Sequence, residues 1–306
     1  MRVGVAGSSG LIGRALVAAL EERGDEVVRF IRTSSSDAAG SIRWNPARGD
    51  VDEDDLRRVG GFDAVVNLAG AGIGDRRWTV ARKHEILESR VAATGTLARV
   101  LRESGVGAGA GAFINASAIG WYGSRGDEVL DESSASGSGF LAEVCRAWED
   151  ATQPLVDAGT TVAHLRTGIV LSARGGALRQ QLGLFRFGLG GRYGSGRQWM
   201  SPVSLFDEVR AVLFLLDHPV SGPVNAVAPS PVTNREFTKV LASAVRRPAI
   251  FAVPQFALDL ALGSEMATEL VFASQRVVPG VLASAGFTFE HPDAASAVAW
   301  ALSAAP

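Results

Sequence analysis

The chain has few residues of the kinds that build disulfides and metal sites. Its 306 residues include one cysteine, Cys145, and four histidines. A single cysteine excludes an internal disulfide framework and is typical of a reducing compartment. We therefore expect a cytoplasmic protein in which Cys145 is a buried structural thiol. The histidines lack metal-ligand spacing, so we expect no metal site.

Long apolar runs and an excess of one charge are also missing. A membrane-spanning helix needs about 20 consecutive apolar residues, and no run in this chain approaches that length. The formal net charge is −2 at pH 7. A nearly neutral chain gives no electrostatic reason to bind nucleic acid or an anionic lipid surface. We therefore expect neither nucleic acid nor a membrane as a partner.

Glycine, in contrast, is abundant, and three of the 36 glycines form a G-x-x-G-x-x-G motif. The motif lies between an apolar run from residue 3, which predicts a buried strand, and an amphipathic helix predicted over residues 11–23. Glycines in this context permit a tight turn, close approach of a pyrophosphate and close packing of helix on strand. The helix start attracts phosphate through its free N–H groups and its dipole. We predict a dinucleotide site, the alternative being a glycine-rich turn that binds nothing. The expected contacts are Gly7, Ser9, Gly10, Leu11, Ile12 and Gly13.

A second predicted strand, residues 26–31, leads into Arg32, Thr33 and Ser34. NAD-binding proteins usually place an acidic residue on the ribose 2′-hydroxyl about 20 residues after the glycines. Here a cation and hydroxyls stand in that neighbourhood, and they suit a 2′-phosphate. We therefore predict that the cofactor is NADP(H) and that Arg32 and Ser34 contact it. Asp37 is the competing residue, and a solvated Arg32 is the simpler alternative.

Strands and helices alternate along the first part of the chain. The alternation predicts an α/β fold with a Rossmann-type, doubly wound parallel sheet. Residues 36–61 are rich in loop-forming and acidic residues, and we expect only a short irregular crossover there. The remaining predicted elements are strands at residues 62–70, 112–117, 160–165 and 223–228, and helices at residues 75–101, 140–157, 206–216 and 233–245, the last capped by Thr233 with Glu236.

The composition of the sequence changes after residue 171. Glycines are frequent in residues 174–197, and the helices predicted after them are shorter. We therefore predict an NADP-binding Rossmann domain over residues 1–171, to which residues 201–228 return. Residues 172–200 and 229–306 are predicted to form a smaller C-terminal substrate lobe.

Further motifs follow the glycines in a familiar order: Asn-Leu-Ala-Gly at 67–70, Ser117 at a strand end, and Leu-Arg-Thr-Gly at 165–168. In this order the chain resembles the extended short-chain dehydrogenase/reductases, the NAD-dependent epimerase/dehydratase superfamily. More narrowly, it resembles an atypical epimerase-like family, often labelled cell-division-inhibitor (SulA) homologues, with a small C-terminal domain of unknown function. The residues that carry the narrower match are 75–78, 121–123, 165–171, 194–198, 247–250 and 253–254.

The resemblance implies further site residues. It makes Ser117 the active-site hydroxyl. The implied cofactor contacts are Leu68, Ala69 and Gly70 beside adenosine and ribose, Thr167, Gly168 and Ile169 beside the nicotinamide, and also Ala116.

Two departures bear on the reaction. Typical members carry Tyr-x-x-x-Lys on the helix after the serine strand; Tyr transfers a proton, and Lys lowers its pKa and holds the nicotinamide ribose. Phe140 and Val144 stand at those positions here. Tyr122 is the best substitute as a proton carrier, the alternative being a packed structural tyrosine. Met200 stands where nucleotide-sugar enzymes place an arginine, which argues against a nucleotide-diphosphate sugar.

Two functions follow from these observations. The first is an NADP(H)-dependent oxidoreductase or epimerase acting on a small carbonyl or alcohol substrate. The alternative is a nucleotide-binding regulatory protein that has lost catalysis, for example one acting in cell division, and the pair Phe140 and Val144 favours it. Because superfamily relatives are often dimers, a homodimer is compatible with either function.

Overall fold

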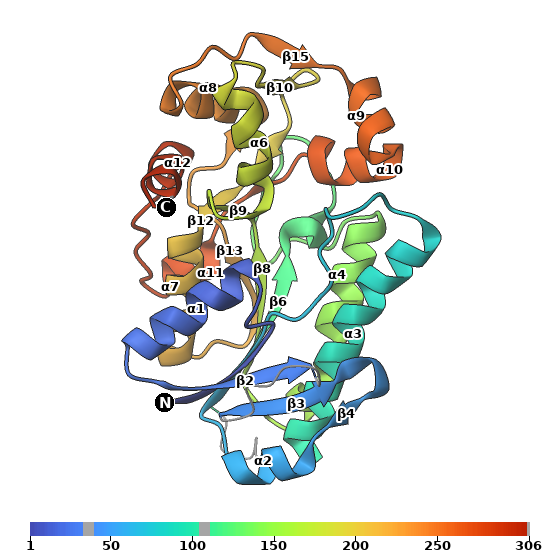
Figure 1. Cartoon of the computed structure of the whole chain (residues 1–306), viewed down its shortest axis with the longest axis vertical. Coiled ribbons are helices and arrows are strands. Elements are labelled where there is room, and N and C mark those ends of the chain that lie inside the picture. Colours follow the sequence, from blue (N-terminus) through green and yellow to red (C-terminus); the bar gives the residue numbers. More distant parts are fainter. Residues whose placement is uncertain (33–39, 104–110, 305–306) are drawn as a thin grey trace.

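The computed structural model describes residues 1–32, 40–103 and 111–304, and its centre is an eight-stranded sheet (Figure 1). All neighbouring strands in this sheet pair in parallel except β3 and β4. The chain starts at β1 and extends the sheet to both sides, which confirms the doubly wound α/β fold. In spatial order the strands are β13 (Gly222–Ala226), β8 (Val162–Thr167), β6 (Ala112–Ala118), β5 (Ala64–Asn67), β1 (Arg2–Ala6), β2 (Glu26–Arg32), β3 (Ser41–Asn45) and β4 (Asp50–Val51).

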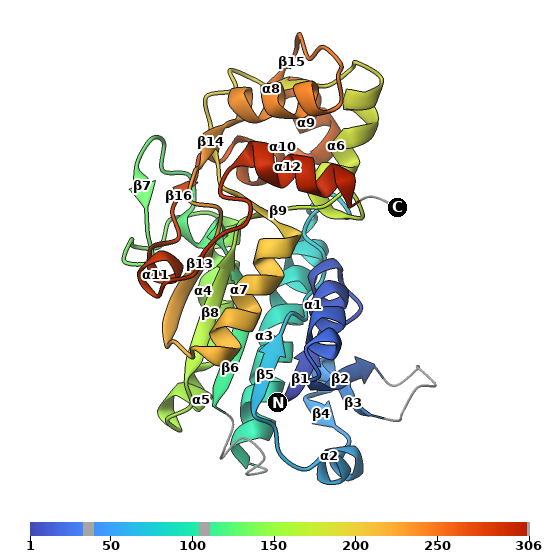
Figure 2. The same ribbon diagram turned by 90° about the vertical axis from the view of Figure 1, so that its left-hand side faces the viewer.

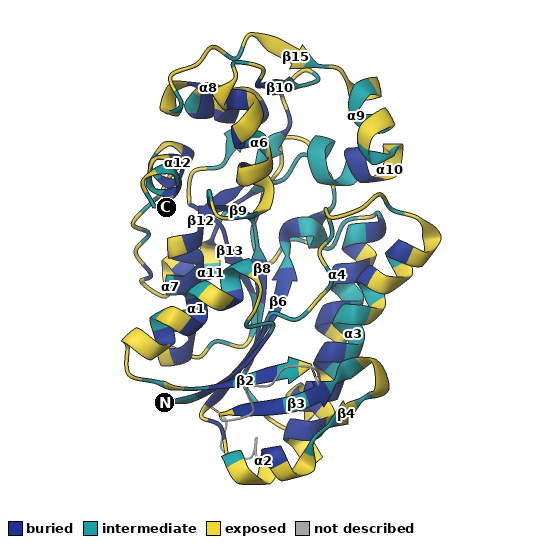
Figure 3. Ribbon diagram, viewed as in Figure 1, coloured by how far each residue is buried: buried dark blue, intermediate teal, exposed yellow. Residues whose placement is uncertain are grey.

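Helices cover both faces of this sheet, as Figure 2 shows from the side. One face carries α1 (Leu11–Glu22) and α7 (Leu205–Asp217); the other carries α3 (Val80–Glu103), α4 (Phe140–Asp150) and α5 (Gln153–Asp157). Strands covered on both faces read as continuous apolar runs, and residues 64–66 of β5 are fully buried accordingly. Figure 3 shows the same burial along the central strands.

The segment after β2 is more regular than the sequence predicted. Instead of an irregular crossover it forms β3, a 3₁₀ turn η1 (Pro46–Arg48), β4 and α2 (Glu53–Val59). Trp44 of β3 packs edge-on against Phe30 of β2, with ring centroids 5.7 Å apart. Only Ile42 and Trp44 give β3 an apolar pattern, which is too short a signal to predict a strand.

The predicted helix over residues 140–157 is also wrong in one respect, because the structure divides it into α4 and α5. Thr152 lies at the break, and its hydroxyl donates to the Glu149 carbonyl at 2.7 Å. Pro154 then occupies the first turn of α5, where its missing N–H costs nothing. A side chain that bonds to the backbone and a proline together end one helix and start another.

Most of the predicted C-terminal lobe, residues 172–200 and 229–306, lies at the end of the molecule away from the N-terminus (Figure 1), whereas α11 (Gly280–Ser284) packs beside the main sheet. Its glycine-rich beginning contains a helix that the sequence analysis missed, α6 (Gly176–Arg186), because Leu178, Leu182 and Phe185 are buried at helical spacing. The predicted cap of α8 (Asn234–Ala244) is confirmed, since Thr233 and Glu236 form a reciprocal capping box. The other elements are η2 (Ile119–Tyr122), β7 (Val129–Leu130), β9 (Ile169–Leu171), β10 (Gly191–Tyr193), β11 (Trp199–Met200), β12 (Pro202–Ser204), β14 (Val232–Thr233), β15 (Phe251–Val253), α9 (Gln255–Leu262), α10 (Ser264–Ala267), the π-helical turn η3 (Thr268–Phe272), β16 (Arg276–Val277), α11 (Gly280–Ser284) and α12 (Ala294–Ser303).

Candidate functional site

The glycine motif forms a tight turn between β1 and α1. Gly7 has a φ of +78°, and its carbonyl accepts from the Gly10 N–H at 3.0 Å. A Cβ added to Gly13 would lie 2.2 Å from the Gly7 oxygen, so helix and turn could not pack as they do. No side chain caps α1, whose N-cap is Gly10, and its first turn contains no acid. The N–H groups of Leu11 and Ile12 are therefore free of competing carboxylates, and the turn fits an anionic group.

Arg32 ends β2, the strand next to β1, and its side chain is exposed. Among the described residues, no carboxylate forms an ion pair with it. Arg32 thus ends the strand beside the one that leads into the glycine turn, where a 2′-phosphate would need a cation. Ser34, predicted to act with it, lies outside the described residues.

The structure brings the other predicted cofactor residues to the same edge of the sheet. Leu68, Ala69 and Gly70 follow the carboxyl end of β5, and all three are at least partly exposed. Ala116 lies inside β6 and is buried, two residues before that strand ends. The strand β8 ends at Thr167, opposite the end of β6, and leads into Gly168 and Ile169. Carboxyl ends of parallel strands on either side of a switch point are where α/β proteins bind ligands.

Ser117 lies beneath this edge rather than on it. Its side chain is buried, and its hydroxyl donates to Glu149 Oε1 on α4 at 2.6 Å. Arg166 of β8 donates to both oxygens of the same carboxylate, each at 2.9 Å. The Ser117 proton is thus donated to a carboxylate that is itself held in a buried ion pair.

Tyr122 belongs to the same network. Its side chain is 0% exposed, its hydroxyl donates to Asn225 at 2.8 Å, and it accepts from Arg166 at 3.1 Å. Burial raises the pKa of Tyr122, although Arg166 acts in the opposite direction. The tyrosine therefore holds its proton within a closed set of partners. Arg166 is the residue that joins the two predicted hydroxyl groups, and only its place in the Leu-Arg-Thr-Gly motif signalled it.

The positions of the missing Tyr-x-x-x-Lys pair form an apolar cluster. Phe140 and Val144 are buried against Ile86 of α3. Trp78 packs edge-on against the Phe140 ring, with centroids 5.0 Å apart, and Lys83 Nζ lies 4.7 Å from that ring. Phe140 and Val144 themselves supply neither a proton nor a charge, and the nearby Lys83 ammonium is paired with Glu265.

A second buried acid, Glu208 of α7, lies on the opposite face of β8. Thr167, predicted to contact the cofactor, donates to Glu208 Oε1 at 2.7 Å. Glu208 is 0% exposed, and its Oε2 has no hydrogen-bond partner among the described residues. Burial raises the pKa of Glu208 to about 8. Sequence reasoning missed this residue, because acids in the first turn of a helix are common on surfaces.

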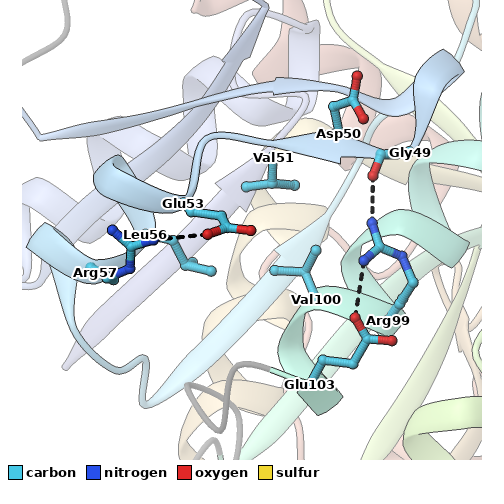
Figure 4. Close-up of a pocket in the computed structure, with 9 residues that line it drawn as sticks. All are labelled: Gly49, Asp50, Val51, Glu53, Leu56, Arg57, Arg99, Val100 and Glu103. Carbon is cyan, nitrogen blue, oxygen red and sulfur yellow. Dashed lines mark hydrogen bonds and ion pairs between the residues drawn. The ribbon is translucent and has the colours of Figure 1, made fainter.

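A pocket of about 670 Å³ lies elsewhere, between β4, α2 and the end of α3 (Figure 4). Four of the five charged side chains that line it are paired, Arg57 with Glu53 and Arg99 with Glu103. Its residues Gly49 and Asp50 follow β3 and η1 in the chain. None of the predicted cofactor residues lines this pocket, so it is no part of the candidate site.

Comparison with known proteins also finds proteins of the epimerase family. Residues 3–142 match the model of the NAD dependent epimerase/dehydratase family, and residues 253–301 match a domain of unknown function, DUF1731. An epimerase family protein of Mycobacterium leprae is 45% identical over 300 residues, 98% of this chain and 95% of that protein. A chloroplastic epimerase family homologue of Arabidopsis thaliana is 37% identical, over 95% and 84% of the two chains.

Comparison with solved structures likewise finds epimerases and epimerase family proteins. The crystal structure of the human epimerase family protein SDR39U1 with NADPH matches all of both chains, with a TM-score of 0.88 and 30% identity. The UDP-glucose 4-epimerase of Thermus thermophilus, in complex with NAD, shares the fold with a TM-score of 0.75 and 19% identity. Within the described ranges, no helix has the length and apolar character needed to cross a bilayer.

Proposed function

Because this chain belongs to the NAD-dependent epimerase/dehydratase family, we propose that it binds NADP(H) and exchanges hydride with a small carbonyl or alcohol substrate. The observation that carries the proposal is the uncapped start of α1, with the exposed Arg32 one strand away and no ion pair to it from any described carboxylate. The human relative was crystallised with NADPH, which supports the choice of the phosphorylated cofactor.

Different groups of the chain would bind different parts of the cofactor. The first-turn N–H groups of Leu11 and Ile12 would receive the pyrophosphate at the positive end of the helix dipole. Arg32 would hold the 2′-phosphate through paired N–H donors, a geometry that a 2′-hydroxyl does not match. The bound nicotinamide supplies or accepts the hydride. Residues 68–70 and 167–169 would border the cofactor along the sheet edge.

In the proton-transfer step, we assign Ser117 and Tyr122 a positioning role and not the role of proton donor. Both hydroxyls are bound to the buried pair Glu149 and Arg166, which fixes the ends of β6 and β8 against α4. A water molecule at the sheet edge would then carry the proton, because Phe140 and Val144 cannot. The expected reaction is slow, since losing a placed proton donor costs roughly a hundredfold to ten-thousandfold in rate.

The substrate side is more apolar than in nucleotide-sugar enzymes. Met200 is half-buried and packs against the apolar core of the C-terminal part. Arg276 stacks on the Trp199 ring at 4.3 Å, so this cation is already engaged. Arg197, which is exposed, and Arg192, which lies against Gly196, are further cations beside residues 194–198. These residues suit a compact substrate that carries one polar group.

The experiment is an equilibrium titration with NADPH and with NADH, followed by nicotinamide fluorescence. We expect tighter binding of NADPH, and we expect Arg32→Ala to reduce that preference by about tenfold or more. Arg29→Ala is the matched control, because Arg29 lies on the same strand and pairs with Glu21. Absence of NADPH binding, or tighter NADH binding, would refute the proposed cofactor.

The second candidate is a regulatory protein that binds the nucleotide without turnover. The specific observation in its favour is the sealed apolar cluster at Phe140 and Val144. Single-turnover reactions with 4-deuterated NADPH and a panel of aldehydes and ketones separate the two. Deuterium in a product supports the oxidoreductase; tight binding with no transfer to any carbonyl supports the regulatory protein.

A further inference from the structure

Glu208 is a buried acid that the proposed cofactor contacts do not use. It stands in the first turn of α7 and is 0% exposed, and its Oε2 has no hydrogen-bond partner among the described residues. A buried carboxyl group without a cation is costly in its charged form, so the group keeps its proton instead. Near neutral pH, Glu208 therefore stores one proton inside the fold.

The surroundings of Glu208 do not stabilise its ionised form. Helix α7 packs against α1, β6, β9 and β12, and these three strands contain no titratable residue. Burial raises the pKa of Glu208 to about 8, the Thr167 hydrogen bond opposes this shift, and no charge from the described part of the chain contributes to it. The charged groups of the neighbouring elements are exposed or engaged elsewhere: Arg14, Glu21 and Glu22 of α1 are exposed, His164 and Arg166 of β8 lie beside Glu149, and Asp207 lies beside Arg210 and His291.

A polar contact leads from Glu208 to the edge of the sheet. Thr167 Oγ1 lies 2.7 Å from Glu208 Oε1 and 3.4 Å from the Leu165 carbonyl oxygen. Thr167 is the last residue of β8 and is partly exposed. Because a hydroxyl group both donates and accepts, Thr167 can take a proton from Glu208 on one side and give its own on the other. The pair thus connects the interior to the carboxyl edge.

The strand order would bring the reacting half of the cofactor toward Thr167. Across the carboxyl edge, the order is β2 with Arg32, β1 with the glycine turn, then β5, β6 and β8. A dinucleotide with its 2′-phosphate at Arg32 and its pyrophosphate at the glycine turn would continue toward β6 and β8. Its nicotinamide would therefore come near the end of β8, where Thr167 lies opposite Ala118 of β6.

From this geometry we infer that Glu208 supplies the proton of the reaction through the Thr167 hydroxyl. The inference rests on the proposed hydride exchange with a carbonyl or alcohol. When a carbonyl carbon gains hydride, its oxygen must gain one proton. That oxygen takes a proton from the water at the sheet edge, the water takes one from Thr167, and Thr167 takes the Glu208 proton. Glu208 is left as a carboxylate and regains a proton from solvent along the same path. Alcohol oxidation runs the same steps in reverse.

The first test follows the proton itself and needs no substrate. A protonated carboxyl group has its own C=O infrared band, which moves when the proton is exchanged for deuterium from D2O. Near neutral pH we expect such a band in the wild type and its loss in Glu208→Gln. Thr167→Val should slow the exchange by about tenfold or more, because the proton must then wait for a local opening of the fold. Thr96→Val, which removes a buried hydroxyl on α3, is the matched control and should not slow it.

The second test uses the aldehyde or ketone that accepts deuterium from 4-deuterated NADPH. The wild-type single-turnover rate should fall as pH rises through about 8, because reduction consumes the proton that Glu208 holds below that pH. Glu208→Gln should lower the rate by about a hundredfold and remove this pH dependence, with NADPH affinity unchanged. A purely structural Glu208 would change stability and leave the pH profile of the reaction as it is.

Three results would each overturn the inference: no carboxyl band that depends on Glu208, equal exchange in the wild type and Thr167→Val, or a pH profile unchanged by Glu208→Gln. Thr167→Ser keeps a hydroxyl and should exchange as fast as the wild type, which separates loss of the relay from a change in packing. If Thr167→Val does not fold, the pH profile of Glu208→Gln remains decisive. Absence of deuterium transfer to every carbonyl would refute the proposed function instead, and the infrared exchange would still decide whether the relay exists.

Discussion

The Arg166 guanidinium binds the Glu149 carboxylate through two hydrogen bonds of 2.9 Å, and both side chains are buried. Two elements distant in sequence, β8 and α4, are joined by this contact. Ser117 and Tyr122 attach to it from the end of β6 and the turn that follows. The pair therefore organises one side of the candidate reaction centre.

The first prediction concerns this ion pair. Glu149→Ala leaves a buried cation uncompensated, and we expect the free energy of unfolding to fall by about 3–5 kcal/mol. Urea unfolding followed by circular dichroism measures it. The control is Glu103→Ala, which breaks an exposed pair with Arg99 and should cost at most about 1 kcal/mol. Equal effects of the two substitutions would contradict the assigned role.

The second prediction concerns Tyr122. Tyr122→Phe removes the hydroxyl that donates to Asn225 and accepts from Arg166, and we expect a loss of about 1–3 kcal/mol in stability. Because the hydroxyl is enclosed, NADPH affinity should not change. Thermal unfolding and the NADPH titration measure the two quantities. A large loss of affinity at unchanged stability would instead place the hydroxyl against the cofactor.

The third prediction concerns pH. The pKa of Glu208 is about 8 in the folded protein, against an ordinary value of 4.5. Between these values the folded protein keeps a proton that the unfolded chain releases, so its contribution to stability is lost as pH rises. The full loss, reached above pH 8, is on the order of 5 kcal/mol.

Glu208→Gln removes this dependence while keeping an acceptor for the Thr167 hydroxyl. Urea unfolding at pH 5.5, 7 and 9 should show the variant gaining stability over the wild type as pH rises. Glu88→Gln, at an exposed glutamate of α3, is the matched control and should show no such trend. A constant difference at all three pH values would argue against a titrating Glu208.

The fourth prediction concerns the lost lysine. Val144 is 3% exposed within an apolar cluster, so Val144→Lys buries an unpaired ammonium group. We expect destabilisation of about 3–5 kcal/mol rather than recovery of activity. Glu143→Lys, one residue earlier and exposed, should cost at most about 1 kcal/mol. A stable Val144→Lys variant would show that the site accepts the usual lysine without rearrangement.

Local sequence patterns determined several elements of this fold. The glycine spacing between an apolar run and an amphipathic helix predicted the turn before α1, and alternating elements predicted the doubly wound sheet. Thr233 and Glu236 predicted the N-terminal cap of α8. These features depend on neighbours within a few residues, so the sequence contains their full cause. Short or interrupted sequence patterns did not predict β3 and α6. Packing against other elements stabilises these two segments.

Tertiary structure alone decided the chemistry of the site. Ser117 looks the same in the sequence whether it faces a ligand or Glu149, and only the packing of α4 on the sheet directs it to the carboxylate. Glu208 is an ordinary helical residue in the sequence, and desolvation by distant segments raises its pKa to about 8. A pKa or an ion pair depends on which groups meet in space, and that meeting is set by the whole fold.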